Sequence, residues 1–173
     1  MRYRYETLFR ITSQPPVVAM KSFLFAYGTL QPGNAPPEIR DALKTLRPAG
    51  HATTPGQLFD LGDYPGAIFD KSRGTVVRGM VYHLADNRDA QLKLLNRLDE
   101  YEGVDGDNSA NSLFVRRKIS VSLRSGRSLD CWAYEYNKPV AQSDAVFDGR
   151  SVGARKKRRT SPKRARSASR VTT

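Results

Sequence analysis

The order of apolar and polar positions predicts a series of short strands in the first half of the chain. Residues 23–27 form a continuous apolar run with aromatic side chains, which is typical of a buried strand. Further strands are predicted at 51–61 (broken at Pro55-Gly56), 67–69 and 75–84. These segments show apolar runs or apolar–polar alternation, and Gly, Pro and Asp bound them. Apolar residues at helical spacing predict a helix at 38–46, which the segment RPAG at 47–50 terminates.

A longer helix and a hairpin are predicted in the second half. Asp86 is the expected N-cap of the helix, and Gly103 is placed to end it. The apolar stripe of this helix consists of Leu92, Leu94, Leu95, Leu98 and Tyr101. Residues 113–123 and 128–136 are predicted strands, and Ser125-Gly126 between them favours a tight hairpin turn. Short strands joined by tight turns, with two helices among them, predict an α+β fold whose sheet is antiparallel or mixed and strongly curled.

The junction after the first strand is a candidate binding site. Gly28 lets the backbone turn sharply and lets another group approach closely. Successive N–H groups at such a turn can converge on an anion, so residues 27–30 are a candidate cradle for a carboxylate. An ordinary strand followed by a β-turn is the simpler alternative, because short turn motifs specify function only loosely.

Glu102 is the candidate for acid–base chemistry. At about 100° per residue, Leu95, Leu98 and Glu102 fall on one face of the predicted helix, whereas Glu100 points to the opposite side. Burial of a carboxylate disfavours its charged form and raises its pKa, which suits a general acid–base near neutral pH. The alternative is a helix that frays at Tyr101 and leaves Glu102 exposed as one of several acids on a solvated end.

The net charge of +12 is concentrated at the two ends of the chain. Residues 150–173 contain ten Lys or Arg and no acid, and residues 1–21 contain four basic residues and one acid. Residues 22–149 therefore hold 15 basic and 16 acidic residues, a nearly neutral composition. This distribution predicts an N-terminal extension at 1–20, a globular domain at 21–142 and a basic, disordered tail at 143–173.

The composition of the tail leaves its role open. Ten positive charges in residues 150–173 would bind nucleic acid weakly and without sequence specificity, and in a nucleated cell they resemble a nuclear address. A solvated extension without a partner is the alternative. No aromatic residue lies between these basic residues, so base stacking is not predicted. A non-catalytic protein whose basic tail binds nucleic acid or another acidic partner is thus the alternative to an enzyme.

Other residue types exclude several kinds of site. Cys131 is the single cysteine, and we expect it to be a buried strand residue. One cysteine excludes an internal disulfide and a Cys-rich metal site. It also suits a reducing compartment, so a cytoplasmic protein is expected. His51 and His83 lack the spacing of a metal site. No apolar run approaches the ~20 residues of a membrane span. Residues 1–20 lack the long apolar region of a secretory signal.

Five short motifs occur in order between residues 22 and 140. They are FAYGTL (25–30), LGDYPGA (61–67), VRGMVY (77–82), LDEYE (98–102) and YEYNKP (134–139). In kind and order these motifs resemble those of the γ-glutamylcyclotransferase-like family, in its AIG2-like or γ-glutamylamine-cyclotransferase branch.

This resemblance implies a small closed or nearly closed β-barrel with flanking helices and a reaction without cofactor or metal. In that reaction the α-amine of a γ-glutamyl amine or peptide attacks its own γ-carbonyl, and 5-oxoproline and the free amine are released. The partner is thus a small-molecule substrate that contains both nucleophile and electrophile, so the enzyme has to fold it and move protons. No motif indicates which amine leaves.

The resemblance also assigns roles to single residues. Glu102 is the expected catalytic acid–base. The residues expected to hold the substrate α-carboxylate and orient the γ-carbonyl, mainly through backbone N–H groups, are Tyr27, Gly28, Thr29 and Leu30. Tyr64, Pro65 and Tyr136 are expected to line the pocket; a plain turn is the alternative for Tyr64 and Pro65, and an aromatic of the barrel core for Tyr136.

Overall fold

The computed structural model describes residues 21–106, 108–141 and 144–146. The strands within these residues are β1 (Phe23–Ala26), β2 (Arg47–Pro55), β3 (Gln57–Asp60), β4 (Pro65–Ile68), β5 (Val76–His83), β6 (Phe114–Leu123), β7 (Ser128–Tyr136) and β8 (Ala145–Val146). The helices are α1 (Pro37–Leu43) and α2 (Arg88–Glu102), with single 3-10 turns η1 (Pro32–Asn34) and η2 (Lys71–Arg73).

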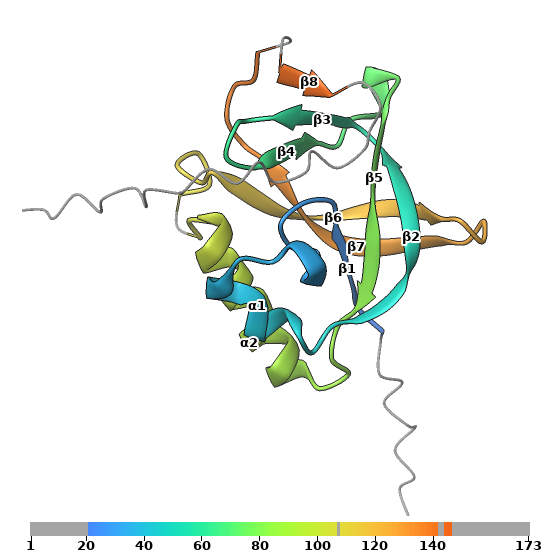
Figure 1. The fold of residues 1–173 in the computed structure, drawn as a ribbon, viewed down its shortest axis with the longest axis vertical. Helices are drawn as coiled ribbons and strands as arrows, with labels where there is room; N and C mark the ends of the chain where they lie inside the picture. Colours follow the sequence, from blue (N-terminus) through green and yellow to red (C-terminus); the bar gives the residue numbers. More distant parts are fainter. Residues whose placement is uncertain (1–20, 107, 142–143, 147–173) are drawn as a thin grey trace, which may run out of the picture.

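Five of the described strands close into a barrel in the order β1-β5-β2-β6-β7, as Figure 1 shows. Neighbouring strands are antiparallel except β1 and β7, which run parallel and pair at Leu24 and Trp132. The other three strands form a small sheet, in the order β4-β3-β8, at one end of the barrel (Figure 1). The predicted α+β fold with a mixed, closed barrel and flanking helices is therefore confirmed.

Alternation along the strands divides the buried side chains into two clusters, because successive strand residues point to opposite faces. Phe25 and Ala133 belong to the cluster inside the barrel, together with Val77 and Val81. The neighbouring Leu24 and Tyr134 belong to the second cluster, on the outside of β1 and β7. Helices α1 and α2 cover this second cluster on one side of the barrel (Figure 1), and they contribute Ile39, Leu43, Leu95 and Leu98 to it.

Strand β2 begins earlier than the sequence pattern predicted. The segment 47–50, expected to be a turn that ends the first helix, forms the first residues of β2, and α1 ends at Leu43. The pairing of β2 with β5 shifts register between Pro48 and Gly50. Such a β-bulge accommodates Pro and Gly in a strand, which is why turn-forming residues did not mark a turn here.

Two expectations about α2 were wrong. The N-cap is Asn87 rather than Asp86, since the Asn87 side chain accepts a hydrogen bond from the backbone N of Ala90 at 3.0 Å. Leu92, predicted to lie in the apolar stripe, is 45% exposed. Leu98 follows Leu92 by six positions, which corresponds to about 240° around a helix, so Leu92 lies on a flank.

The sheet continues past residue 142, where the sequence analysis placed the end of the globular domain. Strand β8 pairs with β3 through Val146 opposite Leu58 and Ala145 opposite Phe59. Residues 1–20 and 147–173, which include the predicted extension and most of the predicted basic tail, lie outside the described residues.

Candidate active site

A narrow cavity lies where the two core clusters meet, beside the end of β1 and the end of α2. Its floor consists of buried residues, namely Phe25, Ala26, Tyr27, Leu30, Glu102, Phe114 and Tyr134. Its rim consists of half-buried residues, namely Gly28, Thr29, Tyr64, Pro65, Tyr101 and Leu113. The free volume is about 50 Å³, enough to hold water.

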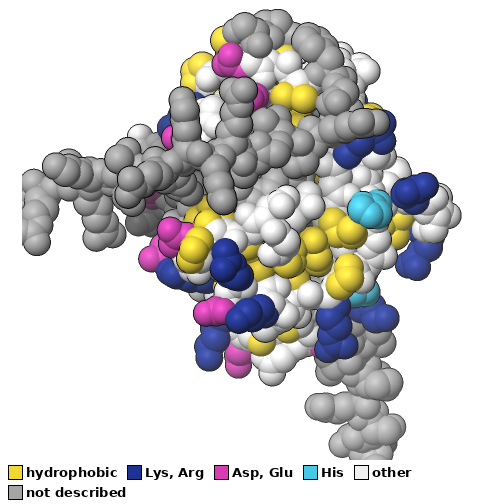
Figure 2. All heavy atoms as spheres, viewed as in Figure 1, with side chains coloured by type: hydrophobic (Ala, Val, Ile, Leu, Met, Phe, Trp, Pro, Cys, Tyr) yellow, Lys and Arg dark blue, Asp and Glu magenta, His cyan; other side chains and the backbone are white. Residues whose placement is uncertain are grey.

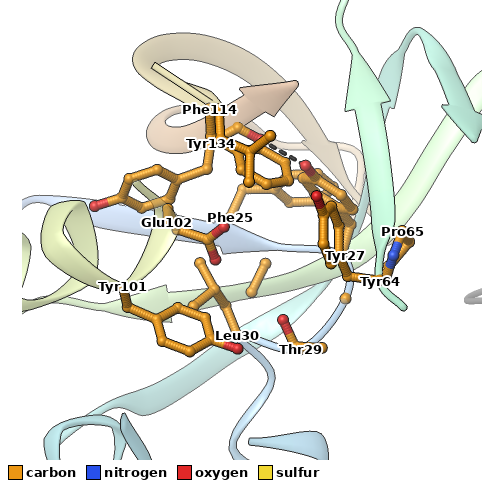
Figure 3. Close-up of a pocket in the computed structure, with 13 residues that line it drawn as sticks. Phe25, Tyr27, Thr29, Leu30, Tyr64, Pro65, Tyr101, Glu102, Phe114 and Tyr134 are labelled. Carbon is orange, nitrogen blue, oxygen red and sulfur yellow. Dashed lines mark hydrogen bonds between the residues drawn. The ribbon is translucent and has the colours of Figure 1, made fainter. Parts of the chain in front are cut away.

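Glu102 is the last residue of α2, and its side chain is only 8% exposed. The helix stays regular to this point because Gly103 follows with a left-handed φ of 67° and donates its N–H to the carbonyl of Asp99. Leu98, fully buried one turn earlier, anchors the same face. Figure 3 shows the Glu102 carboxylate pointing into the cavity, with Tyr101 on one side and Phe114 on the other. The alternative of a frayed, exposed helix end does not apply.

The turn after β1 forms the wall that faces Glu102. The backbone N of Gln31 donates to the carbonyl of Gly28 at 3.1 Å and closes the turn. Within the described part of the chain, the backbone N–H groups of Gly28, Thr29 and Leu30 have no acceptor. A Cβ atom on Gly28 would lie 2.7 Å from Cγ of Pro65, so glycine is required by this close approach and not by a left-handed φ. The turn thus offers donors to a ligand in the cavity.

Tyr27 connects three strands behind this turn. Its hydroxyl donates to the carbonyl of Tyr134 on β7 at 2.6 Å and accepts from the backbone N of Ala67 on β4 at 3.3 Å (Figure 3 shows the first of these bonds). Burial, followed by the negative charge of Glu102, raises the pKa of the Tyr27 phenol well above its usual value. Tyr27 is therefore a neutral hydrogen-bonding group at physiological pH and does not act as a base.

Tyr134 and Tyr101 also line the cavity, although the sequence analysis assigned no functional role to either. The Tyr134 hydroxyl donates to Oδ1 of Asp99 at 2.8 Å, and Nη1 of Arg116 lies 2.8 Å from the other oxygen of Asp99. This network joins β6 and β7 to the last turn of α2, one turn before Glu102. The aromatic residue of the LDEYE motif was a signal for Tyr101, whereas Tyr134 gave no signal beyond its place in a strand.

The structure places six of the seven predicted binding residues on the cavity and one behind it. Tyr64 and Pro65 lie on the rim, next to the turn at 27–30. Tyr136 does not line the cavity. Its ring centroid lies 5.4 Å from that of Phe114, and its Cβ covers Gly66, so it supports the wall from behind.

The cavity combines one carboxylate with backbone N–H donors on the facing wall. None of its described lining residues is Lys, Arg or His, so an anionic ligand group would depend on the N–H donors. A cationic group would pair with Glu102. Among the described residues, no group of three or more His, Cys, Asp or Glu side chains is placed to hold a metal ion. The arrangement is suited to bind a zwitterion and to transfer protons.

Comparison with known families relates this site to a described protein class. A sequence profile of the family described as "Gamma-glutamyl cyclotransferase, AIG2-like" matches residues 24–151. The chain belongs to this family. The matched range includes the turn at 27–30, Glu102 and β8, so family membership covers every element that forms the cavity. No curated protein sequence matches the chain.

Solved structures with a similar fold come from distant organisms. An AIG2-like protein from Mus musculus is 17% identical, with a TM-score of 0.53 over 75% of this chain and 87% of that chain. YkqA from Bacillus subtilis is 21% identical, with a TM-score of 0.54 over 76% of this chain and 40% of that chain. A protein from Arabidopsis thaliana is 19% identical, with a TM-score of 0.51 over 72% of this chain and 74% of that chain. These likenesses show a shared cyclotransferase-type fold.

Two further expectations concern a membrane span and the basic C-terminal residues. In the part of the chain that the structure describes, no helix is both long and apolar enough to cross a membrane. The basic residues between 150 and 173, on which the predicted binding of nucleic acid depends, lie outside that part.

Proposed function

We propose that the chain is a γ-glutamyl cyclotransferase that converts a γ-glutamyl amine or peptide into 5-oxoproline and a free amine. The observation that carries this proposal is the position of Glu102. It is a buried carboxylate at the end of α2, and it shares one cavity with the open N–H groups of the turn at 27–30. Membership of the γ-glutamyl cyclotransferase, AIG2-like family supports the same reaction type.

Substrate binding follows from the charges of the two walls. The α-carboxylate of the γ-glutamyl group is held by the backbone N–H groups of Gly28, Thr29 and Leu30, which lack acceptors among the described residues. The α-ammonium group lies beside Glu102. This orientation folds the glutamyl chain so that its amine approaches its own γ-carbonyl, and such positioning supplies much of the rate of an intramolecular reaction.

The chemical step forms one bond and breaks one bond. Glu102 takes a proton from the α-ammonium, the free amine attacks the γ-carbonyl carbon, and a tetrahedral intermediate forms. The C–N bond to the partner amine then breaks as Glu102 returns a proton to the departing nitrogen. Between ammonium and lactam the attacking nitrogen loses two protons, and the departing nitrogen gains two when it leaves as an ammonium ion. The Glu102 carboxylate carries both protons, one after the other, and no redox change occurs.

The test is release of 5-oxoproline from a panel of γ-glutamyl amines and γ-glutamyl peptides. We expect release from at least one compound, and we expect Glu102→Gln to abolish it while its thermal unfolding temperature and circular dichroism match those of the unchanged protein. The most rapidly converted compound identifies the partner amine. Absence of release from the whole panel contradicts the proposal. Release that persists in Glu102→Gln contradicts the role of Glu102.

A further inference from the structure

A second hollow lies on the outer face of the barrel, on residues that do not line the cavity of Glu102. Its volume is about 610 Å³, which is within the range of small-molecule sites. The polar side chains on its lining are those of Gln31, His51, Thr53, Arg78, Ser122 and Arg124. No motif of the sequence pointed to these residues as a group.

The strand register brings these side chains together. Thr53 on β2 lies opposite Arg78 on β5 and opposite Ser122 on β6. Ala52 and Thr54 are buried, so Thr53 between them points to the outside, and the residues paired with it share that face. Strands β5 and β6 are two strand spacings apart, roughly 10 Å. A row of two hydroxyl groups next to an arginine thus crosses three strands.

A second arginine, Arg124, lies two residues beyond Ser122 along the chain and next to His51. Arg124 follows the end of β6, and its backbone N donates to the carbonyl of His51 at 3.1 Å, which fixes the start of the β6–β7 turn against β2. Basic side chains lie around a histidine over β2 and this turn, on the right of the view in Figure 2. Arg78 on β5 and Arg124 at the end of β6 therefore line the same hollow as the hydroxyl groups of Thr53 and Ser122.

The hollow carries positive charge that the described protein does not neutralise. None of the described residues on its lining is Asp or Glu. Among the described residues, Arg78 and Arg124 form no salt bridge, whereas Arg97, Arg116 and Arg117 each pair with a carboxylate. Helices α1 and α2 pack on another side of the barrel (Figure 1). Among the described residues, no carboxylate pairs with the Arg78 or Arg124 guanidinium group in competition with an anionic ligand.

We propose that this hollow binds a small molecule that carries a diphosphate group. Guanidinium groups bind phosphate oxygens through paired, charge-assisted hydrogen bonds, and two arginines that line one hollow can each take one phosphate. The hydroxyl groups of Thr53 and Ser122 donate to the oxygens between them. The volume of about 610 Å³ leaves room for an organic group beyond the phosphates. This site is independent of the reaction proposed for Glu102.

The test is isothermal titration of the full chain with inorganic pyrophosphate at about 0.15 M salt, where long-range attraction is largely screened. The double variant Arg78→Gln/Arg124→Gln is compared with Arg88→Gln/Lys93→Gln, which removes the same charge from two exposed residues of α2. We expect binding at least about tenfold weaker in the first variant and almost unchanged in the second. Both variants keep residues 150–173, so binding by those basic residues is equal in the two.

A parallel titration with ADP distinguishes the source of the diphosphate. Tighter binding of ADP than of pyrophosphate indicates a nucleoside diphosphate, and equal binding indicates that the diphosphate group alone is recognised. Either result supports the site when the Arg78→Gln/Arg124→Gln variant binds these ligands more weakly than the unchanged protein. Equal weakening in the two double variants overturns the proposal, because binding would then follow overall charge. Absence of binding by the unchanged protein overturns it as well.

Discussion

Glu102 and Glu135 are two buried carboxylates whose charges both act on Tyr27, and their surroundings differ. Their exposed fractions are 8% and 7%, and the charges of both raise the pKa of Tyr27, Glu102 more than Glu135. Glu135 accepts a hydrogen bond from the backbone N of Phe69 at 2.8 Å, and its other oxygen lies 2.8 Å from Nε of Arg117. Glu102 lines a cavity, and the facing wall carries N–H groups that have no acceptor among the described residues.

This difference shows that burial alone does not identify a carboxylate for proton transfer. Both oxygens of Glu135 make structural interactions. One accepts the hydrogen bond from Phe69 at the end of β4, and the other pairs with Arg117 on β6. Alternation along β7 directs Tyr134 towards α2 and the cavity and directs Glu135 away from them. We therefore expect Glu102 to determine activity and Glu135 to determine stability, and the following experiments test this division.

The largest effect is expected on activity, when Glu102→Gln is compared with Glu135→Gln. The two changes are chemically identical, and both sites are buried. General acid–base catalysis contributes about 10²–10⁴-fold, so we expect a loss of 5-oxoproline release of that size in Glu102→Gln and a change below about threefold in Glu135→Gln. The measurement is kcat/KM on the best compound of the panel. Equal losses in both variants would contradict the division between the two carboxylates.

The next effect concerns the wall opposite Glu102. In Gly28→Ala the new Cβ would lie 2.7 Å from Cγ of Pro65, so the turn and the rim have to move apart. We expect kcat/KM to fall about tenfold or more, because small displacements of positioning groups slow an intramolecular reaction strongly. Gly33→Ala is the control, since nothing lies within 4 Å of its added Cβ. A loss in Gly33→Ala as large as that in Gly28→Ala would show that the contact with Pro65 is unimportant.

A smaller effect, on stability, is expected for Glu135→Ala. The change leaves the backbone N–H of Phe69 without its acceptor, and a buried donor left unpaired costs about 1–3 kcal/mol. Arg117→Gln removes only the exposed partner, whose side chain is 62% exposed, and we expect at most about 1 kcal/mol. Urea denaturation measures both free energies of unfolding. A larger loss in Arg117→Gln than in Glu135→Ala would show that the ion pair, and not the hydrogen bond, is what Glu135 provides.

The smallest effect is a pH dependence that originates at Tyr27. Its pKa is raised in the folded state above the usual 10.0, so the folded protein holds this proton more tightly than the unfolded chain. The resulting stability is complete below pH 10 and is lost as pH rises through the folded-state pKa. Tyr27→Phe lacks this contribution and loses two hydrogen bonds, which we expect to lower stability by about 1 kcal/mol at pH 7.

The difference in free energy of unfolding between Tyr27→Phe and the unchanged protein should therefore narrow as the pH rises above 10. Tyr134, whose pKa is also raised by burial and by its bond to Asp99, remains in both proteins and does not affect the comparison. A difference that stays constant from pH 7 to pH 11 would contradict a raised pKa at Tyr27.

The sequence predicted those features that depend on local periodicity and on single punctuating residues. Three such features are the apolar run before Gly28, the helix face shared by Leu95, Leu98 and Glu102, and the hairpin at Ser125-Gly126. Each of them is defined by residues that lie within one turn or one short segment of the chain. The break at Pro55-Gly56 separates β2 from β3 as expected. Predictions were less accurate where tertiary pairing overrides a local signal, as in the bulged start of β2 and at the exposed Leu92.

The residues of the candidate site also divide into those that local patterns predicted and those that depend on tertiary structure. Residues 27–30 and Glu102 were predicted as site residues because a turn after a strand and an acid on an apolar helix face are local patterns, and the structure places them on one cavity. Tyr134 and Tyr101 were not assigned to the site, and Tyr136 was placed in it although its side chain lies behind Phe114. Which strand aromatics face a cavity depends on the alternation of β7 relative to α2, and no periodicity within β7 indicates it.

What the sequence by itself determined is a mixed α+β chain with two local features that suit each other chemically, a turn of N–H donors and an inward-facing carboxylate. Only the tertiary structure decided that they meet, because closure of the barrel places the end of β1 beside the end of α2 although more than half of the domain separates them in sequence. The same closure aligns Arg78, Thr53 and Ser122 on three strands. Side-chain period follows from backbone geometry within each element, whereas register and closure follow from burial summed over the whole barrel.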